Sequence, residues 1–194
     1  MKKVLLIAAL ILTAGIANAQ LKFGVKAGAN ISNVGFDDTD NKVGFNTGVF
    51  GELKISKFAV QPEVLFSMQG AKYDIGSDGK GKIELNYISI PVMAKYYVIP
   101  GLSIEAGPQI GFLMSAKDKA DGEEDFDMKD FMKKTDFSIN FGVSYELPVL
   151  PVGIFARYSL GLTDLYDESK LEPMERDGDY GKNRIFQIGA FVKF

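Results

Sequence analysis

The sequence predicts an all-β protein, an eight-stranded antiparallel up-and-down transmembrane β-barrel with short periplasmic turns and long extracellular loops. Three observations lead to this prediction. The chain opens with a secretory leader, apolar and polar side chains alternate along most of the remainder, and short and long connections alternate between the runs. The last run ends on Phe194, and from Phe186 onwards every second side chain in it is apolar. Alternation with a period of two is typical of strands that have one face in lipid.

The first 19 residues have the pattern of a secretory signal peptide. Two lysines give a positive start, an unbroken apolar run extends from Val4 to Leu12, and Ala17-Asn18-Ala19 provides small residues for a signal peptidase. The apolar run is shorter than the roughly 20 residues that a transmembrane helix needs. We therefore expect residues 1–19 to be cleaved and residues 20–194 to form the β-barrel domain.

The first half of the mature chain contains four alternating runs. In each, one face is apolar, and the other carries mostly glycine, serine, asparagine and glutamine with a few isolated charges. We assign the apolar face to the outside of the barrel and the polar face to its lumen. The outward residues are every second residue of Leu21 to Ile31, Val43 to Leu53, Phe58 to Phe66 and Ile88 to Tyr96.

The second half repeats this pattern in four further runs. Each run is about as long as the roughly 9–11 tilted residues that cross a bilayer. A barrel of about eight strands leaves a lumen only wide enough for side chains, which suits small inward residues. The outward residues are every second residue of Leu102 to Phe112, Phe137 to Tyr145, Val152 to Leu162 and Phe186 to Phe194.

The alternative to a membrane barrel is a soluble sandwich or a lipocalin-like barrel. Such folds place apolar residues inside and scatter solvating charge over the whole polar face. Here the charges on the polar face are few, and the apolar face has almost none within the runs. The pattern therefore favours a barrel whose outer face meets lipid.

The connections alternate between short turns and long polar loops. Short turns on one side and long loops on the other are typical of outer-membrane barrels, whose long loops lie outside the cell. The short turns are residues 54–57, 99–101 and 148–151, and the long loops are about 33–41, 74–82, 115–135 and 164–183.

Several motifs together resemble those of a known group. They are the Ala-Asn-Ala-Gln end of the leader, Phe23 to Asn30, Gln61 to Ser67, Ile88 to Tyr97 and Gly107 to Gly111. With these motifs the chain resembles, over residues 21–194, the PorT-family outer-membrane β-barrel proteins of Bacteroidetes. The resemblance implies an outer membrane protein beta-barrel domain in a Gram-negative cell envelope. It brings no catalytic motif, and although the namesake is a secretion component, nothing in these residues indicates that role.

Charged residues on the inward face form the most suggestive set. Counting back from the turn at 99–101 places Lys95 opposite Glu105. Such a set can act as a gate that passes ions, or it can simply compensate charge in a dry lumen, where an unpaired ion costs several kcal/mol. We favour compensation. The inner layer is Lys26, Glu63, Lys95, Glu105 and Arg157, and a second layer near the periplasmic rim is Lys22, Glu52, Glu146 and Lys193.

The composition argues against an enzyme. The chain has no histidine to act as a general base and no cysteine, so we expect no catalytic residue, no cofactor and no metal site. A pairing of Ser89 with Lys95 is left formally open. Asp74 to Gly79 begins like a calcium loop but lacks the third and twelfth ligands. Without the two leader lysines, 20 basic residues face 25 acidic ones, and this balance argues against nucleic acid.

The third long loop contains a candidate contact surface. Asp127 is placed to cap a short helix in which Met128, Phe131 and Met132 fall on one face. This helix either packs over the barrel rim, which we favour, or serves as a lid or docking surface for a partner.

Our functional prediction is a non-enzymatic integral outer-membrane protein. Its barrel is an anchor, and its loops contact lipid, lipopolysaccharide, or an envelope or extracellular protein. Divalent cations that bridge acidic loop residues to lipopolysaccharide phosphates are one form of this contact. The alternatives are a narrow, porin-like solute channel and an accessory subunit of a secretion or envelope-assembly machine.

Overall fold

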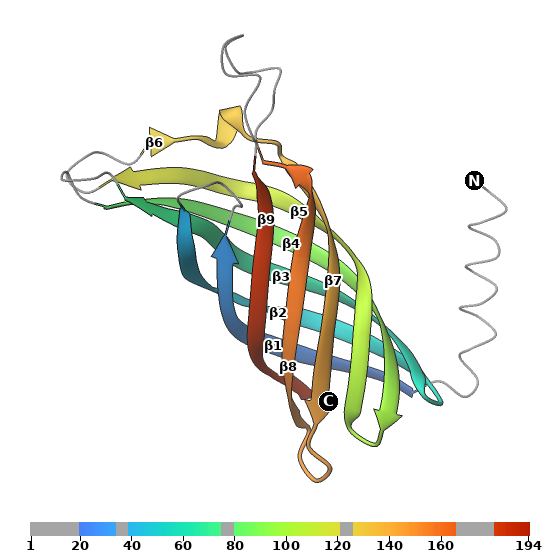
Figure 1. Ribbon diagram of the computed structural model, residues 1–194. Helices are drawn as coiled ribbons and strands as arrows, with labels where there is room; N and C mark the ends of the chain where they lie inside the picture. The colour runs from blue at the N-terminus through green and yellow to red at the C-terminus, as the bar shows by residue number, and fades with distance from the viewer. Residues whose placement is uncertain (1–19, 34–38, 75–79, 121–125, 166–180) are drawn as a thin grey trace, which may run out of the picture.

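The computed structural model describes residues 20–33, 39–74, 80–120, 126–165 and 181–194 (Figure 1). The expected signal peptide lies outside these residues, as do 34–38, 75–79, 121–125 and 166–180 of the long loops. Within the described part, no helix is both long enough and apolar enough to cross a membrane. The strands are β1 (Gln20–Asn33), β2 (Thr39–Ile55), β3 (Phe58–Asp74), β4 (Lys80–Ile99), β5 (Leu102–Ala120), β6 (Phe126–Asp127), β7 (Thr135–Glu146), β8 (Val152–Asp164) and β9 (Lys182–Lys193).

The strands form a closed antiparallel barrel, as the sequence predicts. They pair in the order β4-β3-β2-β1-β9-β8-β7-β5, and β4 pairs with β5 to close the ring of eight, while the two-residue β6 adds to the far end of β5. β1 and β9 bring the two ends of the barrel sequence together. Phe23 and Phe194 exchange backbone hydrogen bonds at 3.1 and 2.9 Å, so the terminal residue takes part in closure.

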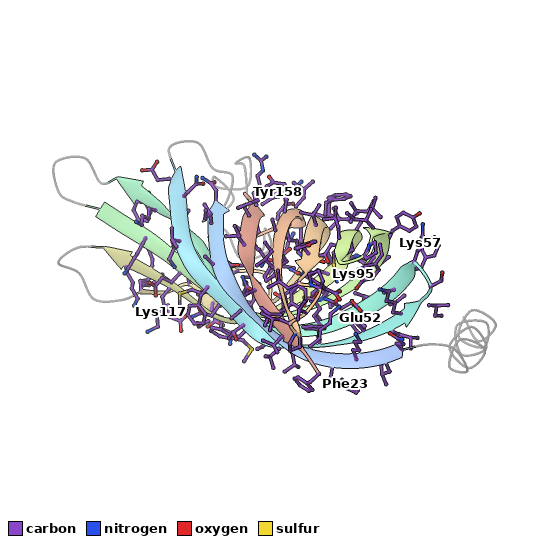
Figure 2. The ribbon with its side chains drawn as sticks, turned by 90° about the horizontal axis from the view of Figure 1, so that it is seen from below. Phe23, Glu52, Lys57, Lys95, Lys117 and Tyr158 are labelled. Carbon is purple, nitrogen blue, oxygen red and sulfur yellow. The ribbon has the colours of Figure 1, made fainter. Side chains whose placement is uncertain are left out.

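The two faces of the barrel are the reverse of those of a soluble protein. Among the described residues, the interior buries 23 polar or charged residues against 16 apolar ones, while large apolar residues cover the outside. Figure 2 shows Glu52 and Lys95 directed into the barrel and Phe23 and Tyr158 on its outer surface. An apolar surface this extensive needs a non-aqueous surrounding. The inside and outside faces that the sequence predicts are therefore correct for the strands within this band.

The three short turns lie where they were expected. β2 and β3 are joined by Ser56 and Lys57, and Ser56 takes a positive φ of 58°. β4 and β5 are joined by Pro100 and Gly101. Proline fixes the first central position of this turn, and Gly101, with a φ of 86°, takes the second, which suits glycine.

The strands next to two long loops continue much further than expected. The sequence placed loops at 74–82 and 115–135, but β3, β4 and β5 are 17, 20 and 19 residues long. The expectation was wrong because both faces change polarity while the strand continues. On β4 the outward residue changes from Ile88 to Asn86, and the inward residue changes from Ser89 to Tyr87. We call residues 70–74, 80–87 and 113–120 the projecting sheet.

Inward aromatic rings lie over cross-strand glycines. Phe191 of β9 is the partner of Gly153 of β8, and a Cβ added at Gly153 would meet the Phe191 ring at 2.2 Å. Phe50 covers its partner Gly24 in the same way, at 2.3 Å. A ring lying on a glycine fills the narrow lumen and shields the strand backbone, a device known as aromatic rescue.

Candidate functional site

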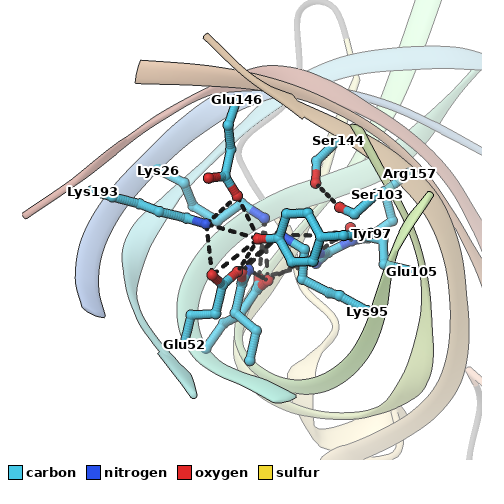
Figure 3. A network of polar contacts seen from close by, with 12 residues as sticks. Lys26, Glu52, Lys95, Tyr97, Ser103, Glu105, Ser144, Glu146, Arg157 and Lys193 are labelled. Atoms are coloured by element: carbon cyan, nitrogen blue, oxygen red, sulfur yellow. Dashed lines mark hydrogen bonds and ion pairs between the residues drawn. The ribbon is translucent and has the colours of Figure 1, made fainter. Parts of the chain in front are cut away.

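Eight charged residues meet in the half of the lumen nearest the short turns (Figure 3). Strand alternation points them inward, and the narrow barrel brings opposite walls within reach of one another. Each of the predicted lumen residues in this group takes part. We call this group the lumen network: Lys26, Glu52, Glu63, Lys95, Glu105, Glu146, Arg157 and Lys193.

Arg157 of β8 is the centre of the network. Its Nη1 and Nη2 donate to the two carboxylate oxygens of Glu63 at 3.0 and 2.8 Å. Its Nε and Nη2 also donate to Glu105 Oε1 at 3.1 and 2.8 Å. A guanidinium fork that holds two carboxylates is a strong and directional contact. Arg157 therefore ties β3, β5 and β8 together across the lumen.

Lys26 of β1 completes the inner cluster from the other side. Its Nζ lies 3.2 Å from Glu63 and 3.9 Å from the centroid of the Phe155 ring. Lys26 is thus held by one carboxylate and by the face of an aromatic ring, a favourable place for a desolvated cation.

Lys95 joins the inner cluster to the rim. It is the cross-strand partner of Glu105, as the hairpin count predicts, but the Nζ-to-carboxylate distance is 3.8 Å. Glu52 is closer, at 3.2 Å, and Gln61 accepts a hydrogen bond from Lys95 at 3.1 Å. The expected simple pair is therefore one contact of a wider set, and the two expected layers are joined through Lys95 and Glu52.

The rim cluster gathers around the Tyr97 hydroxyl. Tyr97 lies at 3.0 Å from both carboxylate oxygens of Glu52 and also contacts Glu146. Lys193 of β9 pairs with Glu52 at 2.8 Å and with Glu146. Lys22, which the sequence placed in this layer, is instead exposed, because β1 extends past the end of the packed lumen.

The lumen network is electrically balanced. Lys26, Lys95, Arg157 and Lys193 oppose four glutamates, and the side chains are almost entirely buried, apart from Glu146 with 23% of its side chain exposed. Removing such charges from water costs several kcal/mol each, and mutual pairing has to offset that cost. Balance of this kind suits a closed packing better than a water-filled path.

An uncharged polar layer lies further along the lumen. Asn30 donates to Ser67 Oγ at 3.0 Å and to the Met68 carbonyl at 2.8 Å. Asn46 and Gln187 both donate to Asn30 Oδ1, at 2.6 and 3.1 Å. These bonds cross from β1 to β2, β3 and β9, so side chains also fill the middle of the barrel.

An apolar cluster closes the end of the lumen next to the long loops. Met132 and Leu165 pack there against inward residues of the projecting sheet. The cluster consists of Ala71, Ile83, Leu85, Tyr87, Leu113, Ala116, Met132 and Leu165.

The predicted contact surface of the third long loop is divided by the structure. The expected helix is only a three-residue 3-10 turn, η2 (Lys129–Phe131), and Asp127 accepts a hydrogen bond from the Lys129 N–H at 2.9 Å. Met132 is buried and Met128 packs on the apolar cluster, whereas Phe131 stays 42% exposed and stacks near Phe126. The three side chains do not share one face, because one short turn is too brief for helical spacing.

The structure does not support a pairing of Ser89 with Lys95. The two residues are six positions apart on β4, roughly 20 Å along a strand. Both side chains are buried, and Lys95 is held by Glu52 and Gln61. Among the described residues, no group of three or more acidic, histidine or cysteine side chains is arranged to hold a metal ion.

Sequence reasoning missed two members of the site. Gln61 bridges by donating to Glu63 at 2.7 Å and accepting from Lys95, and Tyr97 links the two rim glutamates. Both have the inward parity of their strands, so the alternation alone placed them in the lumen. The predicted set contained charged residues alone, so it did not include Gln61 and Tyr97.

Comparisons with known proteins agree with this architecture. A family model described as outer membrane protein beta-barrel domain matches residues 16–167. Neisserial surface protein A is 13% identical with a TM-score of 0.51, covering 91% of this chain and 99% of that chain. Ail, the attachment invasion locus protein of Yersinia pestis, is 16% identical with a TM-score of 0.50, covering 91% and 99%. Identities this low show a shared fold alone. No curated protein matches the chain.

Proposed function

Because the chain belongs to the family of outer membrane protein beta-barrel domains, we propose that it is a non-enzymatic outer-membrane anchor that presents its projecting sheet and long loops outside the cell. The finer resemblance to the PorT-family barrels of Bacteroidetes is part of the same proposal. So is a cleaved leader, which directs the chain across the inner membrane.

The observation that carries this proposal is the filled lumen. A balanced charge network, an amide layer and an apolar cluster follow one another along the barrel. A channel needs a hydrated path, and each of these layers replaces water by packed side chains. The filling therefore favours an anchor over a solute channel.

Orientation is the part of the proposal that an experiment tests most simply. The chain has no cysteine, so single cysteines can be introduced without background labelling. Lys82→Cys lies on the projecting sheet, and Val149→Cys lies in the short turn between β7 and β8. Both parent residues are exposed.

We expect a membrane-impermeant maleimide to label Lys82→Cys on intact cells. Val149→Cys should be labelled only after the outer membrane is permeabilised. Labelling of Val149→Cys but not Lys82→Cys on intact cells would reverse the proposed orientation. Recovery of the protein in the outer-membrane fraction, with gel mobility that changes on boiling, serves as the folding control for both variants.

A further inference from the structure

Three lysines lie side by side on the outward face of the projecting sheet. Lys72 of β3 is the direct cross-strand partner of Lys82 of β4, and Lys82 is in turn the partner of Lys119 of β5. We call these three residues the lysine ladder. Like charges directly opposite one another destabilise a sheet. The fold therefore keeps a row of cations that works against its own stability.

Glu84 forms ion pairs with two lysines of the row. Glu84 lies 3.2 Å from Lys119, 3.4 Å from Lys82 and 3.8 Å from Lys42. Burial disfavours the charged form of Glu84, but the hydrogen bond from Lys119 and the nearby lysine charges hold its pKa below the usual range. Asp40 of β2 is the cross-strand partner of Lys72, so among the described cross-strand partners and ion pairs two carboxylates, Glu84 and Asp40, face the lysine ladder and Lys42. Next to Glu84, Lys117 pairs across the strands with Asp127, which adds no net charge.

Lys42 lies beside this surface and interacts with the charges of Glu84 and of the ladder lysines. It reaches from β2 to Glu84 and donates to the Gln69 carbonyl at 3.2 Å. The pKa of Lys42 is lowered to about 8, mainly by burial; Glu84 acts in the opposite direction, and the ladder lysines add smaller lowering effects.

The lysine ladder stands just above the lipid-facing band. On β4 the last outward apolar residue is Ile88, six positions from Lys82, and on β3 the band ends near Met68, four positions from Lys72. At about 3.3 Å per residue and a strand tilt of about 40°, the ladder lies roughly 10–15 Å beyond the hydrocarbon. Figure 2 shows Lys117 of this surface at the opposite end of the molecule from Lys57 of a short turn. This height matches the phosphate-bearing sugars of an outer leaflet rather than its acyl chains.

We propose that the lysine ladder binds phosphate groups of lipopolysaccharide directly, without a bridging metal ion. Ammonium groups are compact charges that bind phosphate, and a phosphate between neighbouring lysines would relieve their mutual repulsion. The inference rests on the proposed orientation of the projecting sheet. It differs from cation bridging by acidic loop residues, which a chelator abolishes.

The test compares two triple variants of the full chain, folded in detergent and titrated with lipopolysaccharide in the presence of EDTA. Lys72→Gln/Lys82→Gln/Lys119→Gln removes the ladder. Lys129→Gln/Lys133→Gln/Lys134→Gln removes the same amount of charge at and after η2. At roughly fivefold per lysine, the ladder variant should bind about a hundredfold more weakly than the wild type. The control variant should stay within a few fold, and lipopolysaccharide stripped of its phosphates should bind the wild type about as weakly as intact lipopolysaccharide binds the ladder variant.

Three results would overturn the inference: equal affinity of the two triple variants, unchanged affinity for dephosphorylated lipopolysaccharide, or loss of wild-type binding in EDTA. Mobility that changes on boiling confirms that each variant is folded. The cysteine labelling separates the two proposals. Labelling of Lys82→Cys from outside, together with equal binding by both variants, would reject the lysine ladder and leave the anchor function standing.

Discussion

Neutralising Glu63 is expected to be the most damaging single change in the lumen. Glu63 accepts from both Nη atoms of Arg157, at 2.8 and 3.0 Å, and lies 3.2 Å from Lys26. Glutamine keeps the size of the side chain but removes its charge, so Lys26 loses its ion-pair partner and Arg157 loses one of its two carboxylates, keeping Glu105 at 2.8 Å. Breaking one buried pair costs about 3–5 kcal/mol. With two cations affected, we expect Glu63→Gln to lower the free energy of unfolding by about 5 kcal/mol.

Glu105→Gln should be milder, although Glu105 contacts the same arginine. Arg157 would keep its two bonds to Glu63, and Lys95 would keep Glu52 at 3.2 Å and Gln61 at 3.1 Å. No cation is then left without a close polar partner. We expect a loss of about 2–3 kcal/mol, at or below the low end for buried pairs.

The assay is urea unfolding of each variant in lipid vesicles, followed by the fraction that resists SDS without boiling. Ser103→Ala is the neutral control, because Ser103 only shares a hydrogen bond of 2.8 Å with Ser144 and should cost about 1 kcal/mol. Adding Lys26→Met to Glu63→Gln removes one unpaired cation and should recover part of the loss. Equal losses for Glu63→Gln and Ser103→Ala, or a double variant less stable than Glu63→Gln alone, would refute the reasoning.

Three further predictions concern other parts of the barrel. Ile154→Arg, on the lipid-facing side and 59% exposed, should cost about 2–4 kcal/mol in lipid, and membrane assembly unchanged by it would show the face to be wrong. Gly153→Ala should lower unfolding stability, because its Cβ would meet the Phe191 ring at 2.2 Å; adding Phe191→Leu should restore part of it, and no loss in the single variant would count against the packing. Met132→Glu should open the apolar cluster, increasing protease cleavage near η2 while the barrel stays SDS-resistant; unchanged cleavage would contradict its burial.

Much of the barrel follows from the sequence because alternation fixes which face each side chain occupies. Lys26, Glu63 and Arg157 had to point inward together once their strands were recognised, and the tight turn at 99–101 set Lys95 opposite Glu105. The lengths of the connections gave the order of hairpins. These features depend on local periodicity and on short turns, and both can be identified in a single sequence.

The contacts across the lumen did not follow in the same way. Lys95 lies closer to Glu52 than to its predicted partner Glu105, because stagger between strands shifts which residues meet inside a narrow barrel. The long β4 was missed because residues 80–87 exchange the polarity of the two faces and thus look like a polar loop. The rings over glycines, such as Phe191 over Gly153, depend on the register between neighbouring strands. Local sequence patterns do not determine that register.

Conductance of the wild-type barrel in a planar bilayer tests the central claim most directly. With the lumen network, the amide layer and the apolar cluster in place, the inserted protein should show negligible current. The voltages used should be ones at which a known porin gives a clear current. The same preparation must be shown to be folded by its SDS-resistant mobility. A steady and well-resolved current from the wild type would contradict the filled lumen and make the protein a channel.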